Sequence, residues 1–178
     1  MLANVNLIRR SKRIISLMIF FAVSSIFMVW IPDASDIGIK VFAYEKLLVM
    51  LFLGVIIYQI FYQVLKSKKV SADVIFGAIT IYIIFGMIAG ESNQLIYFLD
   101  KNAFAGSLEN AQKSDLRYFS FVTMTTLGYG DISPVSPIAR AVAVFYSLAG
   151  QLYLAVIVAL IVGKYVSHSD KAEKKKVE

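Results

Sequence analysis

Four long apolar stretches constrain this chain more than any other feature of its sequence. They cover residues 14–31, 41–65, 72–90 and 138–165. Because a helix rises about 1.5 Å per residue, each stretch can cross roughly 30 Å of hydrocarbon. A soluble domain of 178 residues could not bury the apolar surface of a chain that is 58% hydrophobic. We therefore predict an all-α membrane protein with four transmembrane helices.

The first stretch follows basic residues within 1–13 and so has one property of a signal peptide. Its apolar core is long, and no clear small-residue cleavage site follows it. We therefore predict that 14–31 is a retained transmembrane helix.

The distribution of charge predicts how the helices are oriented. Basic residues gather in 1–13, in the connection 66–71 and in the tail 166–178, whereas the alternate segments 32–46 and 91–140 hold only six of the eighteen Lys and Arg. By the positive-inside rule, both termini are cytoplasmic and the protein lies in a cell membrane. Topology thus accounts for the net charge of +6, and we predict no nucleic-acid partner.

A short segment between the third and fourth helices carries the second constraint. Residues 115–126 are compatible with a helix but are too few to span, so we predict a re-entrant pore helix. The run "TTLGYGD" follows at 125–131. Non-helical backbone at membrane depth is tolerated only where it is buried in protein or lines water. The loop is therefore expected to line a polar passage.

The residues of this loop suit a dehydrated cation. A row of carbonyl oxygens can point inward if the backbone alternates in handedness, and Gly128 and Gly130 can adopt the positive φ angles that other residues resist. The Thr126 hydroxyl adds a further oxygen. The C-terminal end of the pore helix carries partial negative charge, which also favours a cation.

These features resemble the pore unit of the tetrameric potassium channel family, over about residues 72–165. The segment "VTMTTLGYGD" carries the resemblance. It implies a homotetramer around one axis, with a selectivity filter at 126–130 that binds K⁺ ions as in the carbonyl-lined loops of potassium channels. The implied filter residues are Thr126, Leu127, Gly128, Tyr129 and Gly130, with K⁺ held at the first four, and the implied supporting residues are Thr123, Thr125, Tyr118 and Asp131.

Two departures from the family pattern bear on the stability of the filter. Leu127 stands where the family usually has valine, and Tyr118-Phe119 stand where many voltage-gated relatives have a tryptophan pair. Phe119 has no donor, which leaves Thr123 as the expected partner of the Tyr129 hydroxyl. Tyr118 can still bond Asp131.

The last apolar stretch contains two candidate gating features. Gly150 lies nineteen residues beyond Asp131, where the resembling family often has a hinge glycine. Close packing against the pore helix is the alternative, since small residues are common at membrane helix contacts. Leu154, Val158 and Val162 recur every four residues and share one face. We predict that they form an apolar gate at the cytoplasmic end, which closes by dewetting.

The remaining segments have weaker signatures. The helices 14–31 and 41–65 lack the repeated Arg or Lys of a voltage sensor, so we expect them to pack around the pore. A module that responds to lipid or bilayer tension is the alternative. The tail 166–178 is expected to be solvated, with contact to anionic lipid headgroups as the alternative.

The sequence thus predicts a channel that conducts K⁺ passively, and neither an enzyme nor a protein that needs a cofactor. A K⁺ transporter of this architecture would need four pore repeats in one chain. A weakly selective cation channel would lack a residue such as Tyr129. A subunit of such a transporter, or such a cation channel, remains the alternative. The absence of cysteine excludes disulfides and thiol chemistry.

Overall fold

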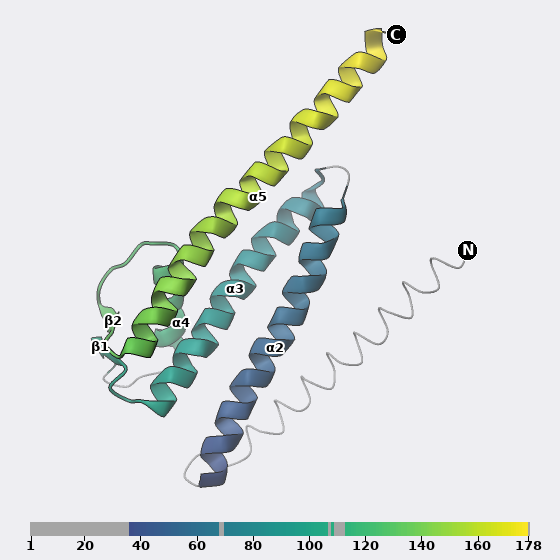
Figure 1. Cartoon of the computed structure of the whole chain (residues 1–178). Helices are drawn as coiled ribbons and strands as arrows, with labels where there is room; N and C mark the ends of the chain where they lie inside the picture. The colour runs from purple at the N-terminus through teal and green to yellow at the C-terminus, as the bar shows by residue number, and fades with distance from the viewer. Residues whose placement is uncertain (1–35, 68–69, 107, 109–112, 178) are drawn as a thin grey trace. The chain divides into compact units, whose positions relative to one another are not determined.

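The computed structural model describes residues 36–67, 70–106, 108 and 113–177. The predicted helix 14–31 lies outside the described residues. The described chain is mostly helical (Figure 1), and its elements are α2 (Asp36–Lys66), α3 (Ala72–Leu99), β1 (Phe104–Gly106), α4 (Lys113–Met124), β2 (Ile132–Pro134) and α5 (Pro137–Val177). The chain divides into two compact units after Gly54, and the apolar clusters and the candidate site described below belong to the second unit, Val55–Glu178.

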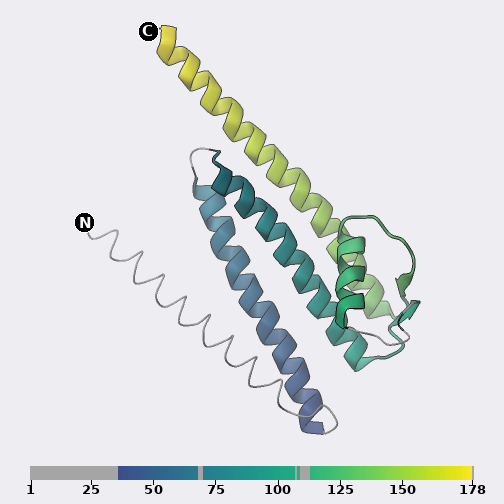
Figure 2. The same cartoon turned by 180° about the vertical axis from the view of Figure 1, so that it is seen from behind.

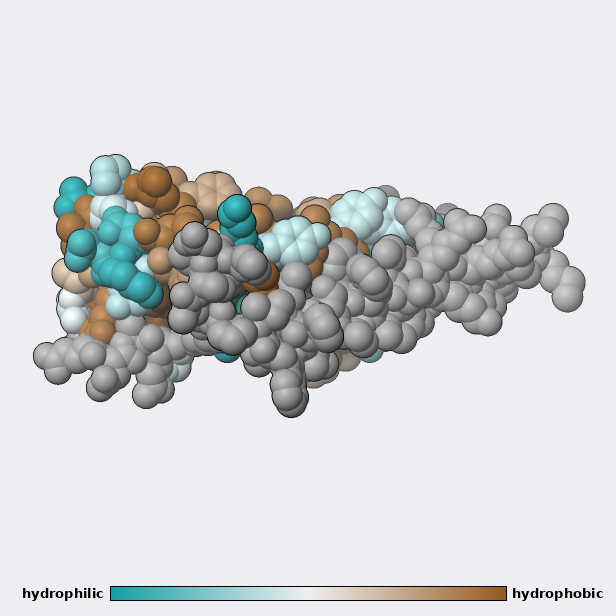
Figure 3. Space-filling view, turned by 90° about the horizontal axis from the view of Figure 1, so that it is seen from below, coloured by the Kyte–Doolittle hydropathy of each residue, from teal (hydrophilic) through white to brown (hydrophobic). Residues whose placement is uncertain are grey.

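Three helices of the described chain are long and apolar enough to cross a membrane. They are Lys40–Lys66, Ala72–Leu99 and Pro137–Lys164. Large apolar side chains remain exposed along all three, and apolar surface is visible in Figure 3. Exposed apolar surface of this extent requires lipid or further protein to cover it. The predicted class of an all-α membrane protein therefore agrees with the structure at 41–65, 72–90 and 138–165.

The helices α3 and α5 run in opposite directions, and α4 packs against both of them (Figure 2). Two apolar clusters hold these elements together. One lies around α4 and the short strands and consists of Ala103, Phe104, Leu116, Phe119, Ile132, Ala139 and Ala143. The other lies at the opposite end of α3, where it joins the last turns of α2 to α5, and consists of Val64, Val74, Ala78 and Ile157.

Three predicted C-terminal helix ends were wrong. The third apolar helix continues from residue 90 to Leu99, because its polar run 91–94 is buried among protein groups and does not mark an exit into solvent. The pore helix ends at Met124 and not at Thr126, whose φ of +60° is incompatible with an α-helix. The last helix continues from 165 to Val177, because the Lys, Glu and Ala of the tail are strong helix formers.

A two-stranded antiparallel sheet was not predicted, because three-residue strands are too short to show alternation. Strand β1 pairs with β2 in a register that places Phe104 opposite Pro134 and Gly106 opposite Ile132. Gly106 has a φ of +118°, and a Cβ added there would overlap the carbonyl oxygen of Asp131. The sheet therefore joins the chain that precedes α4 to the residues that directly follow the loop 125–131.

Candidate functional site

The loop 125–131 begins directly at the C-terminal end of α4. The backbone N–H groups of Leu127 and Gly128 both donate to the carbonyl of Val122, at 3.0 and 3.3 Å. The Thr125 hydroxyl donates to the carbonyl of Phe121 at 2.7 Å, so this side chain turns back along α4. These bonds use carbonyls that the end of a helix leaves without intrahelical partners. The start of the loop is therefore fixed to α4.

The backbone of the loop alternates in handedness. The φ angles of Thr126, Gly128 and Gly130 are +60°, +55° and +79°, whereas Leu127 and Tyr129 have negative φ. The positive values at the two glycines agree with the sequence argument. The value at Thr126 was not foreseen, because a residue with a Cβ avoids this region at a cost of about 1–2 kcal/mol. The alternation is the backbone pattern that the carbonyl-row hypothesis requires.

The side chains of the loop are open in the single chain. Leu127 is 56% exposed and Tyr129 is 65% exposed. Within the described part of the chain, no hydrogen bond joins Thr123 to the Tyr129 hydroxyl, so this predicted pairing stays a prediction. The ring of Tyr129 instead stacks on that of Tyr118, with centroids 6.5 Å apart and an interplanar angle of 11°.

Tyr118 also lies near Asp131, the last residue of the loop. The carboxylate of Asp131 lies near the Tyr118 hydroxyl, and its interaction with that hydroxyl is the main cause that raises the pKa of Tyr118. The structure thus brings together Tyr118, Tyr129 and Asp131. The other aromatic residue of the pair, Phe119, is buried and packs edge-on against Phe104 of β1, with centroids 5.5 Å apart.

Three successive residues of α3 hold α4 and α5 through polar contacts that the sequence argument missed. Arg117 of α4 donates to Glu91 at 2.8 Å, and the hydroxyls of Ser92 and Tyr146 of α5 are 2.8 Å apart. Asn93 follows Ser92 in the chain and contacts Ser120 of α4. The polar run 91–94 gave no signal of this role, because an ESNQ sequence at the end of an apolar stretch is also typical of a helix that enters solvent.

The contact made by Asn93 has a defined direction. The Ser120 hydroxyl donates its single proton to the carbonyl of Leu116 at 2.7 Å, so its oxygen accepts from Asn93 Nδ2 at 2.8 Å. Asn93 Oδ1 is left without a hydrogen-bond partner among the described residues, although the side chain is only 2% exposed. A buried acceptor of this kind is costly, and the bond to Ser120 is a direct tie between α3 and α4.

The structure places Gly150 against the end of α4. A Cβ added to Gly150 would lie 2.5 Å from Met124 Cγ and 2.7 Å from the Met124 carbonyl oxygen. The helix α5 is continuous through Gly150. The close approach supports the packing interpretation of this glycine, while its action as a hinge stays a prediction.

The candidate gate residues lie on a face of α5 that the rest of the described chain leaves open. Leu154, Val158 and Val162 are 39%, 56% and 55% exposed. Their neighbours Tyr153, Ile157 and Ile161 pack instead against the cluster shared with α2 and α3. The described part of the chain contains no group of three or more His, Cys, Asp or Glu side chains that could hold a metal ion.

The segment from α3 to α5 therefore consists of two antiparallel apolar helices, a short helix between them and a loop of alternating handedness. A family model described as "Ion channel" matches residues 77–167, which contain α4, the loop and most of α3 and α5. The chain belongs to this ion channel family. It is thus a membrane protein and a channel protein and, as predicted, not an enzyme.

Several potassium channels are similar to this chain over part of its length. Two-pore potassium channel 5 of Arabidopsis thaliana is 34% identical over 97 residues, which are 54% of this chain and 22% of the relative. Inward rectifier potassium channel Kirbac3.1 of Paramagnetospirillum magnetotacticum is 38% identical over 61 residues, which are 33% of this chain and 21% of the relative.

A third relative is a voltage-gated channel. Potassium voltage-gated channel protein shk-1 of Caenorhabditis elegans is 44% identical over 48 residues, which are 27% of this chain and 9% of the relative. The matched part of this chain thus spans about a fifth or less of the length of these relatives. No solved structure matches the chain. The relatives confirm the predicted likeness to potassium channels.

Proposed function

We propose that this chain is the subunit of a potassium-selective channel that conducts K⁺ passively across a membrane. The alternation of handedness along Thr126, Leu127, Gly128, Tyr129 and Gly130 is the observation that carries the proposal. The potassium channels among the relatives of the chain support it. K⁺ is held at Thr126, Leu127, Gly128 and Tyr129, where backbone carbonyls and the Thr126 hydroxyl replace its hydration shell. K⁺ is the permeant ion, and no cofactor takes part.

The proposed assembly is a homotetramer. Because the loop 125–131 is exposed in the single chain, its own subunit does not enclose a passage. Irregular backbone at membrane depth has to be buried in protein or to line water, so neighbouring copies are needed to cover it. Four copies related by a closed rotation would each contribute one quarter of the filter.

The proposed topology has four transmembrane helices, with 14–31 as the first of them and both termini in the cytoplasm. It is supported by the basic residues in 1–13, 66–71 and 166–178. The channel lies in a cell membrane, and the Lys residues of the helical tail can contact anionic headgroups. The loop 125–131 and Asp131 then face outward, with Tyr118 as the support of Asp131.

The selectivity of the purified protein tests the proposal. With K⁺ on one side of a planar bilayer and Na⁺ on the other, we expect a reversal potential far from zero, because each tenfold preference for a monovalent ion contributes about 59 mV. Single-channel steps far faster than a transport cycle distinguish a channel from a transporter subunit. A reversal potential near zero would instead indicate a weakly selective cation channel.

A charge placed in the proposed gate tests its position. Val162→Asp would put four carboxylates into an apolar collar, hydrate it and raise the resting conductance severalfold, since a hydrophobic constriction closes by dewetting. Val166→Asp is a matched control one turn further along α5, where Val166 is also exposed. Recordings in bilayers measure the open probability of both variants. Unchanged gating in Val162→Asp would indicate that the gate lies at the filter.

A further inference from the structure

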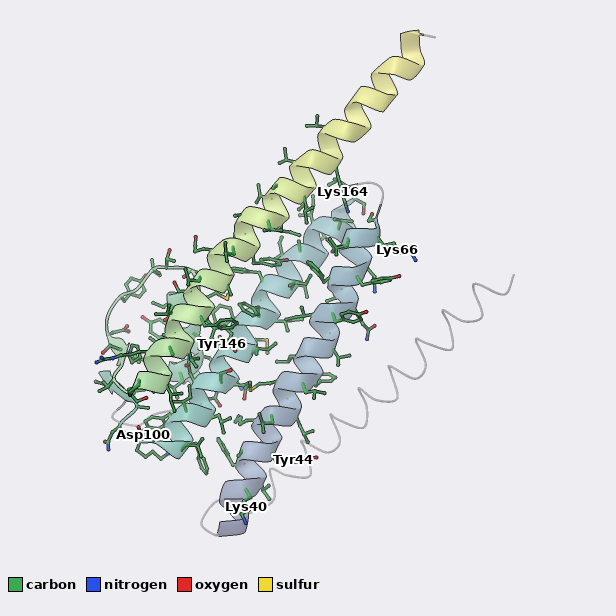
Figure 4. The ribbon with its side chains drawn as sticks, viewed as in Figure 1. Lys40, Tyr44, Lys66, Asp100, Tyr146 and Lys164 are labelled. Atoms are coloured by element: carbon green, nitrogen blue, oxygen red, sulfur yellow. The ribbon has the colours of Figure 1, made fainter. Side chains whose placement is uncertain are left out.

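One lysine of α5 binds the C-terminal end of α2. Lys164 Nζ donates to the carbonyl oxygens of Val64, Leu65 and Ser67, at 2.8, 3.1 and 2.9 Å. An ammonium group has three donors, and all three are used. Figure 4 shows Lys164 next to the end of α2.

These carbonyls are ones that a helix cannot satisfy by itself. The last four carbonyls of an α-helix lack intrahelical partners, and the helix end carries partial negative charge. The Gln63 carbonyl accepts from the N–H of Ser67, whereas the Val64 and Leu65 carbonyls accept from Lys164. A residue of α5 therefore completes the C-terminal cap of α2.

Apolar contacts on the same side of α5 reinforce this bond. Ile157 packs with Val64 in a buried cluster, and Ile161 packs against that cluster. Residues 157, 161 and 164 lie on one face of a helix, since they are four and three positions apart. The exposed residues Val158 and Val162 lie on a different face. Lys164 thus holds α5 from the side that does not carry the proposed gate.

We propose that Lys164 is a positioning residue for the gate, which fastens the cytoplasmic end of α5 to α2 and keeps it from converging on the channel axis. This inference rests on the proposed function. It gives the predicted helix 41–65, which is α2 in the structure, a specific role, because α5 cannot move inward without breaking the bonds to the end of α2 or carrying that end with it. The role is one of mechanical restraint.

The test compares four proteins in planar bilayers: wild type, Lys164→Met, Lys164→Arg and Lys66→Met. Methionine keeps an unbranched apolar stem but has no donor, so we expect the ratio of open to closed channels to fall about tenfold or more, because bonds from a charged donor are lost. Lys164→Arg keeps a charged donor, so we expect its ratio of open to closed channels to lie between those of Lys164→Met and the wild type. The reversal potential should be that of wild type in all variants.

Lys66→Met is the matched control, because Lys66 ends the same helix but its ammonium contacts Tyr62, on its own helix, at 3.4 Å. We expect its open probability to be unchanged. Hydrogen exchange of the segment 60–67 gives a readout that is independent of current: the last turn of α2 should exchange faster in Lys164→Met than in Lys66→Met. Native mass measurement shows whether each variant still assembles.

The inference would be overturned if the open probability of Lys164→Met is unchanged or increased and the hydrogen exchange at the end of α2 equals that of the wild type. An effect of the variant that appears in anionic bilayers but not in neutral phosphatidylcholine would also overturn it, because Lys164 would then act through a lipid headgroup. If the wild-type protein does not select K⁺ over Na⁺, the proposed function is overturned instead. Hydrogen exchange of the segment 60–67 would still test the bond between Lys164 and α2.

Discussion

Replacement of Gly128 by alanine is expected to abolish K⁺ current. Gly128 has a φ of +55°, and in the single chain no atom lies within 4 Å of an added Cβ. The obstacle is therefore the backbone conformation, because L-residues with a side chain avoid this region at a cost of about 1–2 kcal/mol. A homotetramer would carry this cost four times, or about 4–8 kcal/mol per filter. A loop that escapes it by turning to negative φ loses the row of carbonyls.

Bilayer recordings measure the current of Gly128→Ala, and native mass measurement in mild detergent shows whether the tetramer is intact. Gly163→Ala is a suitable control, since Gly163 also has open space around an added Cβ but its φ is not positive. We expect Gly163→Ala to conduct. Normal K⁺ conduction by assembled Gly128→Ala would contradict the role of the positive φ in the proposed filter.

The sequence was sufficient to predict the elements that carry a strong periodic or compositional signal. The apolar stretches 41–65, 72–90 and 138–165 correspond to α2, α3 and α5, because the length needed to cross a bilayer is set by geometry alone. The short helix α4 followed from its length and from the motif after it. The helix ends at Leu99 and Val177 could not be predicted in this way, because the end of a helix depends on the contacts that its polar residues make in the fold.

The candidate site was predicted less completely than the helices. Tyr118 and Asp131 were paired by family resemblance, and the structure brings them together. The tie between Asn93 and Ser120 joins residues that are 27 positions apart, and the bonds of Lys164 reach back by about a hundred. Contacts at such separations leave no local pattern. A lysine at the end of a membrane helix is, in the sequence alone, indistinguishable from one that faces anionic headgroups.

Gly150 shows why one residue can fit two mechanisms. A hinge and a close packing contact both require a small side chain, so the sequence cannot separate them. The structure adds that Gly150 is buried against Met124, the last residue of α4 before the loop. The Met124 carbonyl also lies 3.5 Å from the Tyr82 hydroxyl of α3. The end of the pore helix is thus held between α3 and α5 at this residue.

Gly150→Ala is expected to lower K⁺ selectivity and current together. The new Cβ would lie 2.5 Å from Met124 Cγ and 2.7 Å from the Met124 carbonyl oxygen, so the end of α4 has to shift. Overpacking of this kind costs about 1–3 kcal/mol per chain, and it acts on Met124, two residues before Thr126. A hinge mechanism predicts a different result, in which the open probability changes while the reversal potential under K⁺ and Na⁺ stays that of wild type.

A second substitution separates the two mechanisms further. Met124→Ala removes the Cγ atom that the new methyl group would meet, although the carbonyl oxygen remains. If packing dominates, Gly150→Ala combined with Met124→Ala should recover part of the selectivity, and the two substitutions should be non-additive. If Gly150 is a hinge, truncation of Met124 has no reason to restore bending, and the two effects should add. Reversal potentials of the single and double variants decide between these outcomes, because bending of α5 acts on opening whereas displacement of Met124 acts on the filter.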